Sequence, residues 1–495
     1  MLIANRGEIA GRIARACREA GVRCIAAYSE ADAAAPHLAL ADAVVCLGGA
    51  PASESYLNGE RIVRAARETG ADAIHPGYGF LSENPAFAAL CEEAAIRFIG
   101  PPSEVIRTLG DKAQAKLLAQ RAGVPIVPGY FGADQTGDRL AAEAVAIGAP
   151  LMIKATAGGG GRGMRLVRDL AEFDGLLRDA RREALAVFGR DDVMIERFLD
   201  QPRHVEIQIF GDAEGRVFAL HERECSLQRR QQKVLEESPS PGLTPRLREA
   251  MCAAAERLGE AANYRSAGTV EFLLEGAGDT AEFFFLEVNT RLQVEHPVTE
   301  ARTGLDLVRM QIEIASGRPT PALRRSVPAF GHAIEARISA EDPAHGFAPS
   351  VGTLAVWSAP SGPGVRVDSG VRQGSEVSPY YDPMMAKLIV HAQTRDAAIA
   401  RLVAALEEFY IVGVETNIPF LLDIARDPQF LAGETDIRFI ERRFAGWRPS
   451  GTLPDEVLLA LAATAGDRPA VASAARQQSA VAPAVWSDAG RWRNV

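Results

Sequence analysis

The residues best suited to chemistry lie in one short segment, LEVNTRLQVEH, at positions 286–296. Polar side chains occupy every second position of this segment, at Glu287, Asn289, Arg291, Gln293 and Glu295. Most positions between them are apolar, and such alternation is typical of a half-buried strand. The apolar run EFFFL directly upstream indicates that the strand begins in a core. Two carboxylates on one face of a buried strand require a cation beside them.

A further carboxylate, Glu271 in TVEFLLE, belongs to the strand that we expect to pair with this one through the polar turn EGAGDTA. If Glu271 and Glu287 share a face, their charges lie close together, and a divalent ion would remove the cost of burying them. The oxygen ligands Glu271, Glu287 and Asn289 suit Mg²⁺, or Mn²⁺ in its place. The alternative is a structural network in which these carboxylates pair with Arg291 and other arginines.

The distance along this segment predicts that the strand is short. In a straight strand Glu287 and Glu295 would lie about 26 Å apart, which is too far for one reacting centre. We therefore expect the strand to end near Arg291 and the chain to bend, because Pro297 limits its continuation. Glu287 and Asn289 would then hold the metal, while Arg291, Gln293 and Glu295 would surround the acceptor. A glutamate beside an arginine and a bound anion is a candidate general base.

The basic residues are unevenly divided between the two types. The chain has 49 arginines but only five lysines, at Lys112, Lys116, Lys154, Lys233 and Lys387. Arginine therefore serves wherever a general surface cation is sufficient. We expect the lysines to mark sites that need a compact point charge, which a guanidinium group does not replace.

The elements that position these residues divide into three predicted regions. Residues 1–110 alternate strands with amphipathic helices, which predicts a parallel, Rossmann-like sheet covered on both faces. The turn after the first strand, NRGE, has one glycine, so an NAD site is not expected. Residues 328–440 predict an α+β unit with the strands HAIEARISA and MAKLIVHA and the helix RDAAIARLVAALEEF, and the last 50 residues look loosely organised.

The middle region begins with a helix after Asp111, and it contains the run LMIKATAGGGGRGMRLV. This run reads as strand, glycine loop and strand. A nucleotide-binding glycine turn of the Rossmann or P-loop type opens directly into a helix, and none is expected here. A mobile hairpin whose amides close over phosphates fits better, with Lys154 and Arg162 at its two ends. The alternative is a flexible linker.

Composition excludes several classes of protein. A chain of 495 residues is too long for one core, and we expect three or four domains. The net charge of −10, without a basic run, disfavours a nucleic-acid partner. The six cysteines are scattered, with no CxxC pair, so structural zinc and a disulfide framework are not expected. No apolar run approaches the roughly 18 residues of a membrane span. We expect a cytoplasmic protein with no membrane partner.

Long motifs then reveal a family resemblance over residues 1 to about 445. They are NRGEIA, HPGYGFLSEN, KATAGGGGRGM, RHVEIQ, ECSLQRRQQKVLEESPSPG, LEVNTRLQVEHPVTE and GHAIEARISAEDP. Together they resemble the biotin carboxylase component of biotin-dependent carboxylases, an ATP-grasp family. Within that family the passage YIVGVETNIPFLLDIARDPQFLAGETDIRFIERR is most similar to the alpha subunits of acyl-CoA carboxylases of the methylcrotonyl-CoA type.

The resemblance implies a multidomain fold of α/β and α+β type. Its expected parts are an N-terminal domain (1–110), an ATP-grasp domain (111–320) with a glycine-rich lid at about 128–200, and a C-terminal carboxylase domain (328–440). Residues 441–495 would form a tail that starts a truncated linker to a carrier domain. This chain has no AMKM-like biotinylation motif, so we expect the biotin carrier in trans, and we interpret the chain as a truncated or incompletely assembled gene product.

The resemblance also implies a reaction in which ATP phosphorylates bicarbonate and the resulting carboxyphosphate yields CO₂, which carboxylates N1′ of biotin. By motif match, the ATP phosphates would be held by Lys112, Lys154 and the amides around Gly160 and Gly161. The adenosine pocket would be lined by Glu196, Leu199, His204 and Gln228. Mg²⁺ would be bound by Glu271, Glu287 and Asn289. Bicarbonate would be bound by Lys233, Arg291, Gln293 and the Val294 backbone. Glu295 would deprotonate bicarbonate, Arg291 would stabilise the biotin enolate, and Arg337 would hold phosphate or biotin.

The resemblance further implies a carboxyltransferase subunit as a partner, and a homodimer or a larger hetero-oligomer. Two positions depart from the family pattern: Gln231 stands where many relatives have His or Asn, and Arg197 where Lys is common. Two other functions remain open. One is a different ATP-grasp ligase, of the carbamoyl-phosphate-synthase or purine-carboxylase kind, which would not explain QRRQQKVLEE together with RLQVEHPVTE. The other is an inactive nucleotide-binding subunit that serves assembly.

Overall fold

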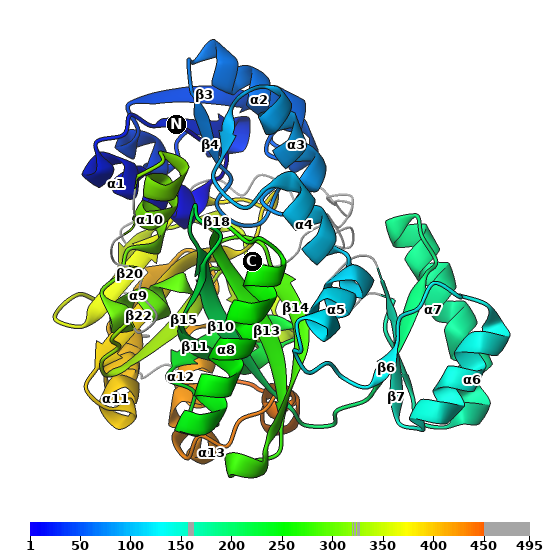
Figure 1. Cartoon of the computed structure of the whole chain (residues 1–495). Coiled ribbons are helices and arrows are strands. Elements are labelled where there is room, and N and C mark those ends of the chain that lie inside the picture. The colour runs from blue at the N-terminus through cyan, green and yellow to red at the C-terminus, as the bar shows by residue number, and fades with distance from the viewer. Residues whose placement is uncertain (157–162, 319, 321–322, 324–326, 450–495) are drawn as a thin grey trace, which may run out of the picture.

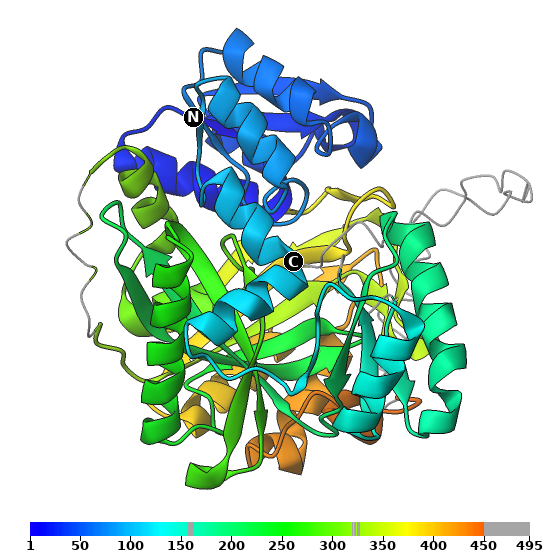
Figure 2. The same ribbon diagram turned by 45° about the vertical axis from the view of Figure 1, so that its right-hand side comes forward.

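The computed structural model describes residues 1–156, 163–318, 320, 323 and 327–449. Figure 1 shows a Rossmann-like unit above a large central sheet, with a smaller sheet-and-helix unit at one side. The turned view in Figure 2 shows the same three parts and the long helices that cover the central sheet. Among the described residues, no helix is long and apolar enough to cross a membrane. The glycine loop with Gly160 and Gly161, and the tail after residue 449, lie outside the described residues.

The N-terminal unit is a five-stranded sheet with the order β3-β2-β1-β4-β5, and all four strand pairs are parallel. Its elements are β1 Leu2–Ile3, α1 Gly7–Ala20, β2 Ile25–Ser29, β3 Ala43–Gly48, α2 Gly59–Glu68, β4 Ala73–His75, α3 Pro85–Glu93, β5 Arg97–Phe98 and α4 Ser103–Gly110. Neighbouring residues of β1 pack into different cores, Ile3 with the residues of α1 and Leu2 with those of α2 and α3. The predicted parallel sheet with helices on both faces is therefore confirmed.

The central sheet has eight strands in the order β14-β13-β10-β11-β12-β15-β22-β20, and every neighbouring pair is antiparallel. Its strands are β10 Arg203–Gly211, β11 Val217–Arg229, β12 Gln232–Ser238, β13 Ser266–Glu275, β14 Glu282–Asn289, β15 His332–Ser339, β20 Val365–Ser369 and β22 Met384–Ala392. Strand β12 pairs directly with β15. The middle and C-terminal regions therefore share one continuous sheet, although the sequence suggested separate units.

Helices and short strands surround this sheet. The helices are α5 Lys112–Arg121, α8 Pro245–Ala261, α9 His296–Thr303, α10 Leu307–Ala315, α11 Arg395–Glu407, α12 Ile418–Arg426, α13 Pro428–Leu431 and α14 Phe439–Arg443. The short strands are β16 Glu341–Asp342, β17 Ala348–Pro349, β18 Gly352–Thr353, β19 Val356–Ser358, β21 Glu376–Val377 and β23 Tyr410–Val412. As predicted, α5 begins directly after Asp111, whose side chain accepts hydrogen bonds from the Ala113 and Gln114 amides.

The smaller unit at the side contains the predicted strand–loop–strand segment. Its elements are β6 Gly129–Tyr130, α6 Gly137–Ile147, β7 Leu151–Ala155, β8 Arg165–Val167, α7 Phe173–Phe188 and β9 Val193–Arg197, with the strand order β6-β9-β7-β8. Strands β7 and β8 pair antiparallel on either side of the glycine loop, so the predicted hairpin flanks are confirmed. Helices α6 and α7 pack on this sheet over a separate apolar core (Figure 2).

The predicted end of the reactive strand is also confirmed. Strand β14 stops at Asn289, and α9 starts at His296 with Pro297 in its first turn. Proline is tolerated there because the first amides of a helix have no intrahelical partner. The loop between them turns the chain back, so that Glu295 lies at the N-terminus of α9 rather than at the far end of a long strand.

Phe285 fixes the strand that carries Glu287 and Asn289, because its ring is fully buried in the core beneath β14. We predict that Phe285→Ala lowers the free energy of unfolding by roughly 3–5 kcal/mol, the usual cost of emptying a buried aromatic position. Urea unfolding followed by fluorescence would measure it. Phe330→Ala is the matched control, because that ring is 71% exposed, and its effect should stay within about 0.5 kcal/mol. Equal effects of the two variants would contradict the prediction.

Candidate active site

The Lys233 ammonium is the centre of the site. Lys233 lies on β12, and its Nζ donates to Glu206 at 2.6 Å, Glu271 at 3.0 Å and Glu295 at 2.6 Å. These carboxylates come from β10, β13 and the start of α9. Burial opposes the charged form of the lysine, but the Cys225 thiol and the carboxylates raise the pKa of Lys233 well above its usual value. One cation therefore holds three separate parts of the chain together.

Glu295 is kept ionised by its surroundings. Its second oxygen accepts from Arg337 at 3.0 Å. Burial acts to raise the pKa of Glu295, but Lys233, Arg337 and Arg223 together hold it far below the usual carboxylate range. The neighbouring Glu236 also accepts from Arg337, at 2.7 Å, yet burial raises the pKa of this carboxyl to about 7. Of these two carboxylates, Glu295 is the one held in the ionised form that a general base requires.

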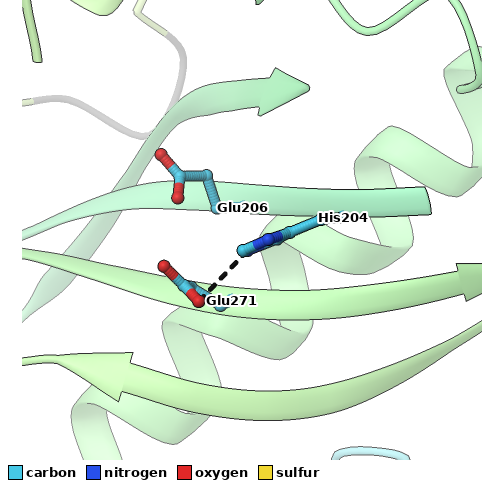
Figure 3. A group of neighbouring side chains, drawn as sticks. All are labelled: His204, Glu206 and Glu271. Atoms are coloured by element: carbon cyan, nitrogen blue, oxygen red, sulfur yellow. Dashed lines mark ion pairs between the residues drawn. The ribbon is translucent and has the colours of Figure 1, made fainter. Parts of the chain in front are cut away.

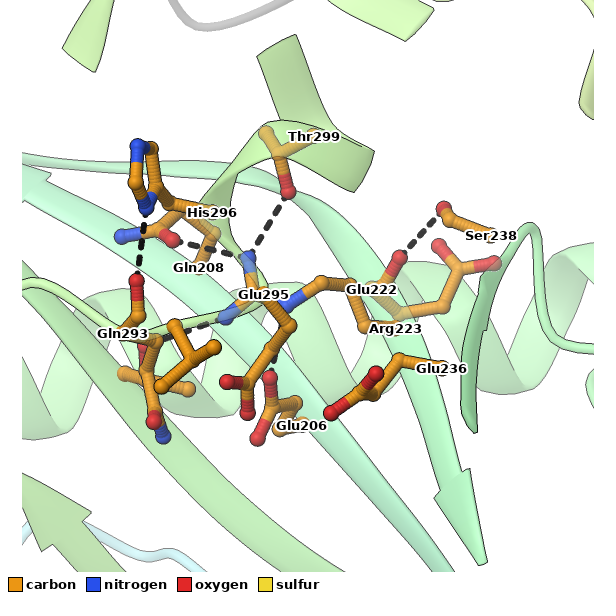
Figure 4. A network of polar contacts seen from close by, with 12 residues as sticks. Glu206, Gln208, Glu222, Arg223, Glu236, Ser238, Gln293, Glu295, His296 and Thr299 are labelled. Atoms are coloured by element: carbon orange, nitrogen blue, oxygen red, sulfur yellow. Dashed lines mark hydrogen bonds and ion pairs between the residues drawn. The ribbon is translucent and has the colours of Figure 1, made fainter. Parts of the chain in front are cut away.

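Figure 4 shows Arg223 among Glu206, Glu295 and Thr299. The fully buried guanidinium donates to Glu206 at 2.6 Å, and to Gln208 and Thr299 at 2.8 Å each. Its bond to Thr299 connects β11 with α9, the helix that begins beside Glu295. Arg223 therefore fixes both the strand residue Glu206 and the helix that follows the candidate base.

His204, Glu206 and Glu271 form a compact group (Figure 3), and Lys233 donates to both of its carboxylates. The candidate ligand atoms of these three residues lie within 4.8 Å of one another. His204 Nε2 lies 3.1 Å from Glu271, which raises the pKa of the histidine even though burial opposes the charge. A second such group joins Glu206 and Glu295 to Cys225. Glu206 belongs to both groups, is fully buried and already accepts from Arg223 on one oxygen and from Lys233 on the other, so we assign no metal to either group.

The predicted metal ligands meet at one place. Glu271 and Glu287 are direct cross-strand partners in the β13–β14 pair, as the sequence predicted. Asn289 Nδ2 donates to Glu271 at 2.8 Å, and Glu287 lies 3.6 Å from the Lys112 ammonium. Glu271, Glu287 and Asn289 all line the same cavity. Two carboxylates and an amide at the wall of an open cavity fit Mg²⁺, which takes few protein ligands and completes its shell with water and phosphates.

This cavity of about 500 Å³ lies between the small side unit and the central sheet. The predicted site residues that line it are Lys112, Lys154, Leu199, His204, Gln228, Lys233, Glu271, Glu287, Asn289, Arg291, Gln293 and Arg337. Gln231 and Arg197, which depart from the family pattern, line it too. The predicted Gly160 and Gly161 lie outside the described residues. Side chains from elements between α5 and β15 therefore line one cavity.

Three predicted residues lie behind the cavity wall instead. Glu196 is 1% exposed and sits between two lysine ammonium groups. Val294 is fully buried, and its carbonyl accepts from Lys387 Nζ at 2.7 Å. Glu295 is also fully buried, within reach of the cavity through Lys233 and Arg337.

The Arg291 guanidinium is fixed by two predicted site residues, Asn289 and Gln293, and by Glu83, which the sequence did not indicate. Its guanidinium donates to Asn289 at 3.0 Å and to Gln293 at 2.9 Å. It also donates to Glu83 at 3.2 Å, a residue of the N-terminal unit that in addition accepts from the Thr290 amide. Glu83 stands in the motif HPGYGFLSEN, but nothing in its spacing pointed to Arg291, which lies 208 positions away.

Sequence reasoning also missed Glu206, Arg223 and Lys116 as parts of the site. The alternation in RHVEIQ placed Glu206 on the same face as His204, and this was the available signal for it. Arg223 gave no signal, because arginine is common throughout the chain. Lys116 was among the five lysines, but no motif assigned it a function.

A second cavity, of about 200 Å³, adjoins the first. It lies between the N-terminal unit and the central sheet, and its lining includes Tyr78, Tyr381 and Asp382. Lys233 and Arg337 line both cavities. The two residues that bond Glu295 therefore face both cavities, and the candidate base lies directly behind them.

Three family models match the chain. "Biotin carboxylase, N-terminal domain" matches residues 1–106, "Carbamoyl-phosphate synthase L chain, ATP binding domain" matches residues 111–323, and "Biotin carboxylase C-terminal domain" matches residues 335–442. The biotin carboxylase of Nostoc sp. is 51% identical over 441 residues, which are 89% of this chain and 98% of that protein.

The chain belongs to the biotin carboxylase family. It is also similar to the mitochondrial methylcrotonoyl-CoA carboxylase subunit alpha of Mus musculus, with 49% identity over 451 residues. That alignment covers 91% of this chain but only 62% of the mouse protein. The chain therefore spans less than two thirds of this longer relative.

Two solved biotin carboxylases have the same fold. The biotin carboxylase domain dimer of the Hydrogenobacter thermophilus 2-oxoglutarate carboxylase, determined with MgADP, ADP and bicarbonate, matches with a TM-score of 0.86 at 45% identity. The alignment covers 91% of this chain and 98% of that one. The Campylobacter jejuni biotin carboxylase in complex with β,γ-ATP also has a TM-score of 0.86, at 43% identity, with 89% and 98% covered.

We predict that the substitution Lys233→Met makes the free energy of unfolding fall as pH rises from about 5 to 8. In the wild-type chain the pKa values of Glu271 and Glu295 lie below the ordinary value of about 4.3, so their stabilising contribution is present above that pH and is lost on acidification. Without Lys233, burial should raise these pKa values, and the variant should lose stability as pH rises from about 5 to 8. The difference in free energy of unfolding should grow over this range to about 3–5 kcal/mol.

Urea unfolding at several pH values would measure this difference. Arg139→Met is the control, because it removes an exposed pair with Glu143 and should cost less than about 1 kcal/mol at every pH. A Lys233→Met effect that does not change between pH 5 and 8 would contradict the prediction.

Proposed function

We propose that this chain uses ATP and bicarbonate to carboxylate N1′ of biotin, as the biotin carboxylase subunit of an acyl-CoA carboxylase. The observation that carries the proposal is the position of Glu295. This ionised carboxylate is bonded to Lys233 and Arg337, and both of these cations face two adjoining cavities. Such a base lies where a nucleotide in one space and an acceptor in the other would meet.

The larger cavity would hold ATP. Lys112, Lys154 and the Gly160–Gly161 amides would bind its phosphates, and Leu199, His204 and Gln228 would line the adenosine pocket. Glu196, which is buried behind the cavity wall, would support the adenosine pocket without lining the cavity. Glu271, Glu287 and Asn289 would hold Mg²⁺, which when bound neutralises charge on the phosphates. Residues 128–200 would serve as the lid over the nucleotide, and Gln231 can make a polar contact with it.

Bicarbonate would bind between Lys233, Arg291, Gln293 and the Val294 backbone. Glu295 would take its proton, and a bicarbonate oxygen would attack the γ-phosphorus of ATP, giving carboxyphosphate and ADP. Carboxyphosphate would release CO₂ and phosphate. The protein's contribution is mainly position and charge, because phosphoryl transfer needs little covalent help from side chains.

Biotin would bind in the smaller cavity beside Arg337. The phosphate released from carboxyphosphate would take the N1′ proton of biotin, and Arg291 would stabilise the resulting enolate while N1′ attacks CO₂. Because Glu83, Asn289 and Gln293 already fix the Arg291 guanidinium, this charge needs little rearrangement during the reaction. Lys233 on β12 and Arg337 on β15 both bond Glu295 at the start of α9, so three separate elements are connected at the base.

The partners follow from the family. We propose that biotin arrives on a carrier domain in trans, that a carboxyltransferase subunit uses the carboxylated carrier, and that the chain works as a homodimer or within a larger hetero-oligomer. The similarity to methylcrotonoyl-CoA carboxylase alpha subunits supports an acyl-CoA carboxylase of that type. The dimer of the Hydrogenobacter thermophilus domain supports a dimeric state.

We predict that the purified chain releases ADP from Mg-ATP and bicarbonate, and that free biotin stimulates this release. Glu295→Gln should reduce the biotin-dependent rate by roughly 10²- to 10⁴-fold, because it removes the general base but keeps the shape of the side chain. Glu260→Gln is the control, since Glu260 is exposed on α8 and should leave the rate unchanged. A coupled assay for ADP would measure all three chains.

The same assay separates the alternatives. ADP release that needs bicarbonate but ignores biotin would favour another ATP-grasp ligase. ATP binding without any turnover would favour an inactive assembly subunit. A Glu295→Gln chain that keeps its biotin-dependent rate would overturn the assignment of the base.

A further inference from the structure

Lys116 is a buried cation that the proposed reaction does not use. It lies on α5, one helical turn after Lys112, so both side chains project from the same face of this helix. Lys112 lines the large cavity, whereas Lys116 is 3% exposed and does not line it in the described part of the chain. A buried ammonium is costly unless it neutralises a nearby anion.

That anion is Glu196. Its Oε1 lies 2.5 Å from Lys116 Nζ, and its Oε2 lies 2.6 Å from Lys154 Nζ. The carboxylate is 1% exposed, and although burial opposes its charge, Lys154 and Lys116 lower the pKa of Glu196 to about 2. Two cations therefore share one buried anion, which leaves one positive charge in excess.

The two lysines differ in what else they contact. Lys154 lies on β7, is 17% exposed and faces the cavity. Lys116 comes from α5, outside the four-stranded sheet of β7 and β9, and its ammonium also lies 5.9 Å from the centre of the buried Phe285 ring. Lys154 can turn towards a ligand in the cavity, whereas Lys116 is enclosed at the carboxylate.

We propose that Lys116 is a positioning residue for nucleotide binding: it keeps Glu196 paired, so that Lys154 can leave this carboxylate for an ATP phosphate. Without Lys116, the same movement would strand a buried, unpaired carboxylate, and ATP would have to compete with Glu196 for Lys154. The inference rests on the proposed function, in which Lys154 binds phosphate. It adds a residue that no motif assigned.

The test is nucleotide binding to the full chain, measured by calorimetry with Mg-ADP and with a non-hydrolysable ATP analogue. We expect Lys116→Met to bind both about 10- to 100-fold more weakly than the wild-type chain. Adenosine, which has no phosphate, should bind both chains equally. In turnover assays the KM for ATP should rise while kcat at saturating ATP changes little.

A second substitution separates this mechanism from simple damage to the fold. The double variant Lys116→Met with Glu196→Gln removes the competing carboxylate as well, and we expect it to regain most of the lost nucleotide affinity. Because the proposed function places Glu196 behind the adenosine pocket, the Glu196 variants are compared by the ratio of their Mg-ADP affinity to their adenosine affinity. In Glu196→Gln alone this ratio should be at least as large as in the wild-type chain, and a smaller ratio would overturn the inference. This single variant keeps the inference testable even if Lys116→Met does not fold.

Arg248→Met is the matched control, because it takes the cation from another buried carboxylate, Glu222, at 2.8 Å, and neither residue lines the large cavity in the described part of the chain. Its nucleotide affinity should stay within about twofold of wild type. Wild-type affinity in Lys116→Met, equal loss of adenosine binding, or no recovery in the double variant would each overturn the inference.

Lys154→Met distinguishes this inference from the proposed function. If that variant binds Mg-ADP as well as the wild-type chain, the proposed phosphate contact itself is wrong. If Lys154→Met loses affinity but Lys116→Met does not, the phosphate contact stands and the positioning role of Lys116 fails.

Discussion

The structure of the site depends on one constraint, which is that three buried carboxylates must meet the Lys233 ammonium. Each of Glu206, Glu271 and Glu295 is almost completely buried, and each would be strongly destabilising without a nearby cation. The bonds are satisfied only when β10, β12, β13 and the start of α9 meet at one point. Arg223 and Arg337 extend this condition to β11 and β15. The charge balance therefore fixes the relative positions of most of the central sheet.

The same condition explains why the sheet continues through two regions of the sequence. Lys233 lies on β12 and Arg337 on β15, and these two strands are neighbours. Both side chains bond Glu295, one to each of its oxygens. A break in the sheet between β12 and β15 would separate them and would also separate the two cavities that they line. The continuity of the sheet is thus a requirement of the site.

Lysine and arginine have different tasks in this chain. All five lysines lie close to carboxylates, from the half-buried pair of Lys112 with Glu287 to the fully buried Lys387, which lies 3.3 Å from Glu8. A compact ammonium can be shared between several carboxylates, or can change partner, because its charge is not spread over a planar fork. Arg223 and Arg291, in contrast, are each fixed by several directed hydrogen bonds. All five lysines therefore serve carboxylates of the site or of the core, and none of them is a general surface cation.

The sequence by itself determined the local elements and the types of ligand. Alternation located β14, and the distance argument together with Pro297 predicted its end. The hairpin turn predicted that the strands of Glu271 and Glu287 pair, and the structure then showed that these two residues are direct partners. These features depend on neighbours in the chain, so the sequence records them directly. Long motifs supplied the family. The scarcity of lysine indicated that the five lysines occupy special sites, but it did not indicate which carboxylates they bond.

Only the tertiary structure decided which distant residues share a charge. Glu83 reaches Arg291 across 208 positions, Lys116 reaches Glu196 across 80, and Lys233 serves carboxylates on both sides of it in the chain. Such pairs leave no periodic signal, because buried charges are matched in space and not along the sequence. The cost of an unpaired buried charge selects the partners, and that cost exists only once the surrounding sheet has excluded water.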